Sequence, residues 1–189
     1  MAARHGDSFS EPLNSEIRVL GEGSYARVFL ENMKVAVKKI KIITKDAEKE
    51  LETLMELNHP HIIKYFSHYY EERSLCIVME YAEWGTLTQV IQTEAQTAGS
   101  MWFKEFAIWR FLAQMGSAIN YLHCHARPIL HRDLKPDNIL GVTNPQNGLT
   151  VWKISDFGLA KLLEEDQGFY VQTVCGTATY MAPEVTVYN

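Results

Sequence analysis

The chain has 189 residues, of which 47% are hydrophobic and 22% are charged. This balance is typical of a globular domain with a buried core and excludes a disordered tail. A formal net charge of −5 gives no basis for broad binding to nucleic acid or to an anionic membrane, so we expect neither partner. The polar first sixteen residues and three cysteines without a pairing pattern predict an intracellular protein, cytoplasmic or alternatively nuclear, without a signal peptide or membrane span.

The first half of the chain is predicted to be mainly sheet. Residues 1–16 have no periodicity and are expected to form a flexible lead-in. Apolar and β-branched runs bounded by polar turns indicate β-structure in four segments. These segments are Ile17–Leu30, Met33–Ile40, His61–Tyr70 and Ser74–Tyr81.

A helix is predicted at Lys45–Leu57, because its apolar residues fall on one arc at a spacing of three or four. Glu48, Glu52 and Glu56 lie on the opposite side and are expected to be solvated. Glu50 instead projects into the apolar arc, where a carboxylate is costly without a cationic partner. The pattern therefore predicts that a lysine or arginine from another segment pairs with Glu50.

The second half of the chain is predicted to begin at the connector Glu83–Thr86 and to be led by helix. A polar linker is expected around Gln92–Ser100. It precedes a long, well-buried helix at Phe103–His123, whose apolar residues recur at helical spacing. A short strand is expected at Leu149–Ile154.

Gly21 and Gly23 belong to a glycine-rich stretch, Gly21–Val28, that lies between strand-like segments. Glycines allow a backbone to approach a polyphosphate closely. The stretch lacks the Gly-Lys-Ser/Thr ending of a Walker A loop and is not followed by a helix, as a dinucleotide-binding turn would be. Taken alone, it is explained equally well by a glycine hairpin.

Three further motifs carry polar and charged residues in a set order. Lys38 ends the apolar run Val35–Lys38, and the loop His131–Asn138 places a carboxylate, a cation and an amide within six positions. The sequence Asp-Phe-Gly at 156–158 follows a short apolar strand. In this order, and together with the glycine-rich stretch, the motifs resemble the catalytic domain of eukaryotic serine/threonine protein kinases.

The resemblance implies an α+β, bilobal protein-kinase-like fold, with a β-rich N-lobe containing one helix and a partial, mainly helical C-lobe. The kinase domain is expected at residues 17–189, with the N-lobe and the start of the hinge at 17–82 and the C-lobe at 83–189. The chain stops just after Ala182-Pro183-Glu184. We therefore expect the domain to be C-terminally incomplete, without its last third.

The same resemblance assigns the catalytic groups. Lys38 is expected to hold the α- and β-phosphates of ATP and to pair with Glu50, with Glu48 as the alternative, because only 12 positions separate Lys38 from Glu50. Asp133 is expected to accept or orient the proton of the substrate hydroxyl. Lys135 is expected to neutralise charge on the transferred phosphoryl group.

Two residues are assigned to Mg²⁺ and a larger set to the nucleotide. Asn138 and Asp156 are the expected ligands of Mg²⁺. The nucleotide-contacting positions comprise the glycine-rich loop, the roof and floor of the adenine pocket, the gatekeeper and the hinge. Besides Lys38, they are Leu20, Gly21, Gly23, Val28, Ala36, Met79, Glu80, Ala82 and Leu140.

A regulatory switch is expected in the segment after Asp156. Thr173 stands where the family carries an activating phosphorylation site, which an upstream kinase would modify. Arg132 and Lys161 are the cations expected to receive the phosphate. Thr177, together with Lys135, matches kinases specific for serine and threonine.

The function implied is transfer of the γ-phosphoryl group of Mg-ATP to serine or threonine hydroxyls of a protein substrate. The alternative is a catalytically impaired, truncated fragment that binds nucleotide or a partner. A small-molecule phosphotransferase is a third possibility, against which Ala182-Pro183-Glu184 argues. Within the family, Leu75–Tyr81 followed by Gly85–Leu87 is similar to the NIMA-related branch.

Overall fold

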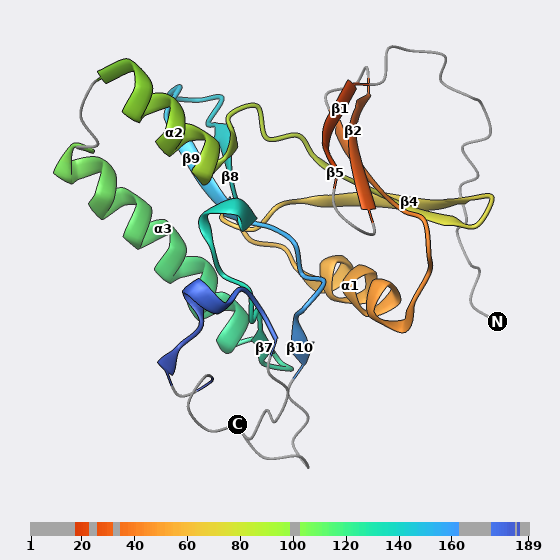
Figure 1. Ribbon diagram of the computed structural model, residues 1–189. Coiled ribbons are helices and arrows are strands. Elements are labelled where there is room, and N and C mark those ends of the chain that lie inside the picture. The colour runs from red at the N-terminus through yellow and green to blue at the C-terminus, as the bar shows by residue number, and fades with distance from the viewer. Residues whose placement is uncertain are drawn as a thin grey trace.

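A five-stranded antiparallel sheet forms one half of the molecule in the computed structural model, and helices with short strands form the other (Figure 1). The structure describes residues 18–22, 26–31, 35–98, 103–162, 175–183 and 185. The protein is therefore mixed α and β and divided into two lobes, as expected of the α+β, bilobal class. The lead-in at 1–16 lies outside the described residues.

The large sheet has the strand order β1-β2-β3-β5-β4. Its strands are β1 (Arg18–Glu22), β2 (Ala26–Glu31), β3 (Val35–Ile40), β4 (Tyr65–Glu71) and β5 (Ser74–Glu80). The predicted segment Ile17–Leu30 thus contains two strands that pair with each other. Because β3 lies at the centre, between β2 and β5, residues on it are held in register from both sides.

Helix α1 (Lys45–Glu56) is the only helix in the described part of this lobe, as the periodicity predicted. Thr44 caps it, since its hydroxyl accepts the N–H of Ala47 at 3.2 Å. Leu51 and Leu54 are buried on the side of the helix that carries Glu50. The cap and the apolar face together fix how α1 is seated and therefore where Glu50 points.

The strand predicted from His61 begins only at Tyr65. Residues before it are extended but pair elsewhere: Ile62 forms a parallel bridge with Ile154, and the N–H of Ile63 donates to the Ile154 carbonyl at 2.9 Å. The prediction was wrong at this end because alternating apolar residues indicate an extended backbone without identifying its partner. This pairing joins the segment after α1 to the second lobe.

Helix α2 (Leu87–Ala98) replaces most of the linker predicted at Gln92–Ser100. A reciprocal cap begins it: the Gln89 N–H donates to the Thr86 hydroxyl at 3.2 Å, and the Thr86 N–H donates to the Gln89 side-chain oxygen at 2.8 Å. The prediction of a linker was wrong because the polar composition outweighed this capping signal.

Helix α3 (Glu105–His123) was predicted with accurate bounds, but it is buried on one side only. Met115, Ala118 and Leu122 are buried, whereas Phe106 and Leu112 are 71% and 51% exposed. Among the described elements, β7 and β9 pack against α3, and they cover one face. The prediction of a well-buried helix was therefore wrong for the opposite face.

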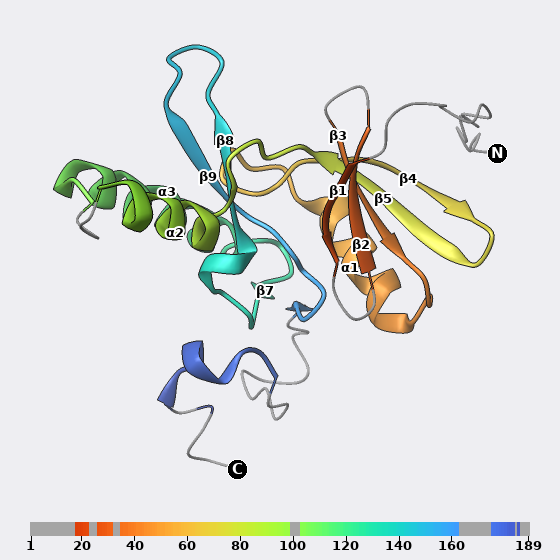
Figure 2. The ribbon, with the colours of Figure 1, turned by 45° about the horizontal axis from the view of Figure 1, so that its top comes forward.

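Short strands complete the second lobe and were largely missed by the sequence patterns. They are β6 (Gly85–Thr86), β7 (Ile129–Leu130), β8 (Ile139–Thr143), β9 (Thr150–Ile154) and β10 (Lys161–Leu162). They form a three-stranded sheet ordered β6-β8-β9 and a two-stranded sheet of β10 and β7. Figure 2 shows the β8–β9 hairpin projecting from the body of the molecule.

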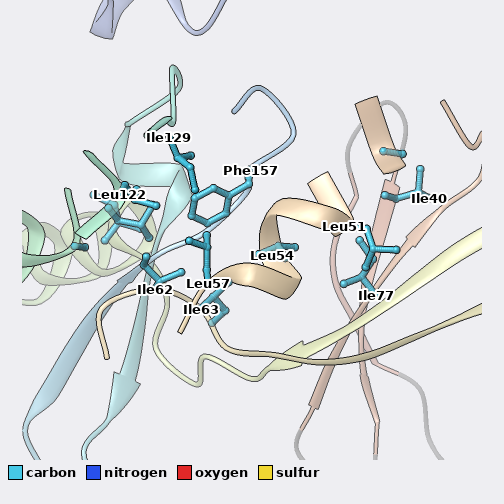
Figure 3. Close-up of a cluster of buried hydrophobic side chains, with 14 of the residues drawn as sticks. Ile40, Leu51, Leu54, Leu57, Ile62, Ile63, Ile77, Leu122, Ile129 and Phe157 are labelled. Atoms are coloured by element: carbon cyan, nitrogen blue, oxygen red, sulfur yellow. The ribbon is translucent and has the colours of Figure 1, made fainter. Parts of the chain in front are cut away.

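One buried cluster runs through both lobes. In Figure 3, Leu54 of α1 and Leu57, which follows the helix, lie between Ile77 on the sheet side and Phe157 on the other. Ile129 and Leu122 continue the cluster into the second lobe. None of the helices in the described residues combines the length and apolar character that a membrane crossing requires.

Candidate active site

Lys38 and Glu50 form an ion pair between the central strand and α1. The Lys38 Nζ lies 2.6 Å from Glu50 Oε1, and the Glu50 residue is 5% exposed. Glu48, the alternative partner, is exposed on the other side of the helix. The cost of burying a carboxylate within an apolar face is thus met by a lysine from β3.

Lys38 is shared with a second carboxylate, that of Asp156, whose Oδ1 lies 3.0 Å from Nζ. Burial acts to lower the pKa of Lys38, but the charges of Glu50 and Asp156 outweigh it, so this pKa is raised. Burial raises the pKa of Glu50, and Lys38 offsets this only in part. Loss of hydration acts to raise the pKa of Asp156, but Lys38 holds it below its ordinary value.

The Asp-Phe-Gly motif is held between α1 and the loop at His131. Phe157 is 1% exposed, and its ring packs edge-to-face on the His131 imidazole at 5.0 Å between centroids. Asp156 has φ of +61°, a conformation rarely adopted by a non-glycine residue. Burial of the phenyl ring and this turn of the backbone direct the Asp156 carboxylate toward Lys38.

The His131 side chain is hydrogen-bonded both to the segment before Asp156 and to the catalytic loop that carries Asp133. Its Nε2 lies 2.9 Å from the Ser155 carbonyl and must donate to it, since a carbonyl only accepts. Nδ1 then lacks a proton and accepts the N–H of Asp133 at 3.3 Å. Burial lowers the pKa of His131, which favours this neutral form.

Asp133 sits at the centre of a hydrogen-bonded group. Lys135 Nζ lies 2.8 Å from Asp133 Oδ2 and donates to the Thr177 hydroxyl at 2.7 Å. The Thr177 N–H and hydroxyl both donate to Asp133 Oδ1, at 2.9 and 2.8 Å. Burial acts to raise the pKa of Asp133, but the bonds from Lys135 and Thr177 outweigh it and hold this pKa below its ordinary value.

Asn138 and Asp156 offer oxygen ligands of the type that Mg²⁺ prefers. The buried Asn138 amide donates from Nδ2 to the main-chain and side-chain oxygens of Asp133, at 2.8 and 2.9 Å. These bonds occupy the Nδ2 donor, and the amide oxygen is the remaining acceptor of this side chain. An amide oxygen and a carboxylate held on neighbouring segments fit a magnesium ion that is also bound by phosphates.

Gly176 allows the segment that carries Thr177 to approach the catalytic loop. Its φ is +111°, and a Cβ at this position would lie 2.4 Å from the Arg132 carbonyl oxygen. Neither the conformation nor the space admits a side chain. The position of Thr177 over Asp133 therefore depends on glycine at 176.

The predicted adenine-contacting residues that the structure describes lie on β3, β5, the connector after β5, and β8. Ala36 is directly opposite Met79 in the pairing of β3 with β5, and Glu80 is the last residue of β5. Ala82 follows in the connector, and Leu140 lies on β8. Residues far apart in the sequence are thus brought to the junction of the two lobes.

Some predicted residues are described only as backbone or not at all. Leu20 and Gly21 lie on β1 and Val28 on β2. Gly23 and the predicted phosphorylation site Thr173 lie outside the described residues.

Arg132 and Lys161, the predicted receivers of a phosphate, lie on neighbouring segments. Arg132 has φ of +64°, and its Nε donates to the Leu159 carbonyl at 2.7 Å. Lys161 on β10 is opposite Leu130, two residues before Arg132. With Thr173 outside the described residues, their regulatory role stays a prediction.

The comparison with protein families agrees with this geometry. Residues 15–189 match the model of the protein kinase domain. The chain belongs to the protein kinase family. The expected fold and the recognition of a serine/threonine kinase catalytic domain are thereby confirmed.

Individual relatives of this kinase domain are protein kinases of several kinds. The chain is 39% identical over 181 residues to Sucrose non-fermenting protein kinase 1 of Fusarium virguliforme, covering 89% of the chain and 24% of that protein. It is 35% identical over 176 residues to mouse Serine/threonine-protein kinase Nek5, covering 89% and 26%. It is 33% identical over 180 residues to CBL-interacting protein kinase 25 of rice, covering 88% and 34%.

The chain thus spans about a quarter to a third of the length of these relatives. Identities of 39% and 35% to kinases of the SNF1 and Nek types are similar. The NIMA-related branch accordingly stays a prediction.

Sequence reasoning missed one ion pair of this kinase domain that joins the lobes. Lys153 Nζ on β9 lies 2.9 Å from Glu80 Oε2 at the end of β5, with side chains 11% and 22% exposed. The same oxygen accepts the Lys64 N–H at 3.2 Å. The sequence did contain a signal for this pair, because Lys153 is a charged residue within the largely apolar strand Thr150–Ile154. Glu50 was identified by the same kind of signal, a charge among apolar residues.

Proposed function

We propose that this chain carries the catalytic part of an ATP-dependent serine/threonine protein kinase, which transfers the γ-phosphoryl group of Mg-ATP to serine or threonine hydroxyls of proteins. The observation that carries the proposal is the environment of Asp133. Its carboxylate is held by Lys135, Thr177 and Asn138 within hydrogen-bonding distance.

In this proposal Asp133 accepts a hydrogen bond from the substrate hydroxyl and orients the oxygen toward the phosphoryl group. Its lowered pKa keeps it ionised at neutral pH, as a group that takes up a proton must be. Lys135, which already contacts Asp133, lies where it can neutralise charge that develops on the transferred group. Thr177 holds both side chains in place.

Lys38 binds the phosphates of ATP in this mechanism, while Glu50 fixes the position of its ammonium group. Asn138 and Asp156 hold the metal ion, and we propose Mg²⁺ because both offer oxygen ligands. When bound, Mg²⁺ neutralises negative charge on the phosphates. Loss of Asn138 or Asp156 is therefore expected to reduce turnover more than folding.

Regulation by an upstream kinase at Thr173 is also proposed, with Arg132 and Lys161 as the receiving cations. Arg132 belongs to the catalytic loop, and Lys161 lies on β10, which pairs with the strand just before that loop. The absence of nucleic-acid and membrane partners and the intracellular location stay predictions that rest on composition.

The decisive experiment measures transfer of radiolabelled phosphate from ATP to casein by the purified chain and by its Asp133→Asn variant. We expect the variant to lose about 100-fold or more of the rate, because a neutral amide cannot take up the proton of the substrate hydroxyl as a carboxylate can. Asp137→Asn is the matched control, since Asp137 is an exposed carboxylate of the same loop and should retain the wild-type rate.

Nucleotide binding by both proteins is measured in parallel by calorimetry. Asp133→Asn should still bind Mg-ATP, so a lost rate can be assigned to the transfer step. Equal rates for wild type and Asp133→Asn would overturn the proposal. Binding of ATP without phosphate transfer would instead support the nucleotide-binding fragment.

A further inference from the structure

The connector between the lobes is fastened to β8 by two consecutive residues. Glu83 Oε1 accepts the N–H of Thr143 at 2.7 Å, and the Trp84 indole N–H donates to the Thr143 hydroxyl at 3.0 Å. The main-chain N–H of Trp84 donates to the Gly141 carbonyl at 3.1 Å. Thr143 thus receives one contact at its backbone and another at its side chain.

Gly141 makes this close approach of Trp84 possible. A Cβ at Gly141 would lie 2.8 Å from the Cβ of Trp84 and 3.2 Å from Cζ3 of Trp152. The first of these atoms is fixed by the backbone, so it cannot move aside easily. Glycine at this position therefore lets the Trp84 side chain lie over β8 and reach Thr143.

Glu83 and Gly141 each adjoin a residue of the expected adenine site in the sequence. Glu83 directly follows the hinge residues Glu80–Ala82. Gly141 follows Leu140, the expected floor of the site, and successive residues of a strand face opposite sides. Trp84 thus lies against the face of β8 opposite to Leu140.

A free connector would allow the hinge and the floor to move relative to each other. The connector passes from β5 to α2 close to β8 (Figure 1). The pairing of β6 with β8 at this junction involves two positions on each strand, so it provides limited support by itself. Side-chain bonds to Thr143 add a second point of attachment.

We propose that Glu83, Trp84 and Thr143 form a clasp that fixes the hinge relative to Leu140 and thereby sets the affinity of the site for adenine. Thr143 is a positioning residue, because it acts through Trp84 and Glu83. This proposal rests on the proposed function in that it takes the nucleotide to bind at the hinge.

The test compares Thr143→Val, which has the same shape without the hydroxyl, with Trp84→Phe, which lacks the indole donor. Binding of adenosine and of Mg-ATP is measured by calorimetry, and exchange of the main-chain amide hydrogen at position 84 is measured by mass spectrometry. Both variants should bind both ligands roughly three- to tenfold more weakly, because one hydrogen bond is lost. The amide at position 84 should exchange faster in both.

Two further variants make the test specific. The double variant should bind adenosine about as strongly as whichever single variant binds it less well. The reason is that both substitutions remove the same hydrogen bond, between the Trp84 indole and the Thr143 hydroxyl. Thr150→Val is the matched control, because Thr150 is opposite Thr143 in the pairing of β8 with β9. It should leave adenosine affinity and exchange at Trp84 unchanged.

Unchanged adenosine affinity in Thr143→Val would overturn the proposal, as would an equal loss in Thr150→Val. Additive losses in the double variant would also contradict it. If the wild-type chain binds neither adenosine nor Mg-ATP, the proposed function fails. In that case, the amide hydrogen of Trp84 could still exchange slowly in the wild type and faster in Thr143→Val. This result would still support the clasp as an attachment of the hinge.

Discussion

Thr177 donates both its main-chain N–H and its hydroxyl to the same carboxylate oxygen of Asp133, at 2.9 and 2.8 Å. The two residues are 44 positions apart, and the hydroxyl also accepts a bond from Lys135. One small side chain therefore determines the orientation of the proposed acceptor and the proposed cation together.

Thr177→Val is expected to lower the rate of phosphate transfer about tenfold while leaving ATP affinity unchanged. Valine keeps the shape and the main-chain bond, but Asp133 and Lys135 lose the hydroxyl between them. Steady-state kinetics should show a fall in kcat with an unchanged KM for ATP. Thr177→Ser keeps the hydroxyl and should retain most of the rate, whereas equal losses in both variants would contradict this role.

Lys38→Met is expected to lower the free energy of unfolding by about 3–5 kcal/mol, because Glu50 is left buried without a cation. Denaturant titration measures the change. Adding Glu50→Gln should recover part of the loss, since the buried charge is removed.

Lys39→Met is the matched control on the same strand. Lys39 pairs with Glu71 at 2.7 Å, but the two side chains are 30% and 54% exposed. Its loss should cost less than about 1 kcal/mol, as is usual for exposed ion pairs. A similar loss in both lysine variants would show that Glu50 does not need Lys38.

Acidification is expected to destabilise the protein through His131. Burial lowers its pKa in the folded state, so below the ordinary value of 6.5 the unfolded chain binds a proton more readily. The stabilisation is fully present above that value and is lost as the pH falls toward the lower folded pKa. Denaturant titrations between about pH 7 and about pH 5 should show a falling free energy of unfolding.

The pH dependence should be weaker in His131→Gln, although His59 and His61, whose pKa values are also lowered by burial, will contribute some of it. His123 is exposed at the end of α3, and His123→Gln should leave the dependence unchanged. An unaltered slope in His131→Gln would exclude His131 as a contributor.

Gly176→Ala and Gly116→Ala are expected to act in opposite directions. At 176 the added Cβ meets the Arg132 carbonyl at 2.4 Å, and the backbone strain is of the order of 1–3 kcal/mol. At 116, within α3, the added Cβ would meet no atom within 4 Å apart from its chain neighbours and the backbone of the helix itself, and alanine should stabilise the helix by about 0.5–1 kcal/mol. Thermal unfolding measures both changes, and loss of stability at both positions would contradict the assignment of free space at Gly116.

The sequence predicted one contact of the site from a local pattern that carried a physical cost. Glu50 within an apolar arc required a cation, and Lys38 was its expected partner. The reciprocal cap between Thr86 and Gln89 was equally local, but the polar composition around it outweighed the signal. Local chemistry thus identified positions that need a partner more reliably than it identified ends of elements.

What the sequence could not supply depends on contacts between distant segments. Phe106 is exposed because no described element packs against that face of α3. Periodicity predicts an apolar face on a helix but does not predict which element packs against it. Thr143 is 60 positions from Glu83 and 59 from Trp84, and nothing in the composition of the hairpin marks it. Such pairs arise only when the chain has folded.

The buried cluster that includes Ile77, Leu54 and Phe157 has no break at the junction of the lobes. Two lobes with separate interiors could melt at different temperatures and be studied as isolated pieces. Here α1 contributes to the packing of both, so the lobes should lose their tertiary structure in a single cooperative step. Cutting the chain at the connector would consequently expose the interior of each half.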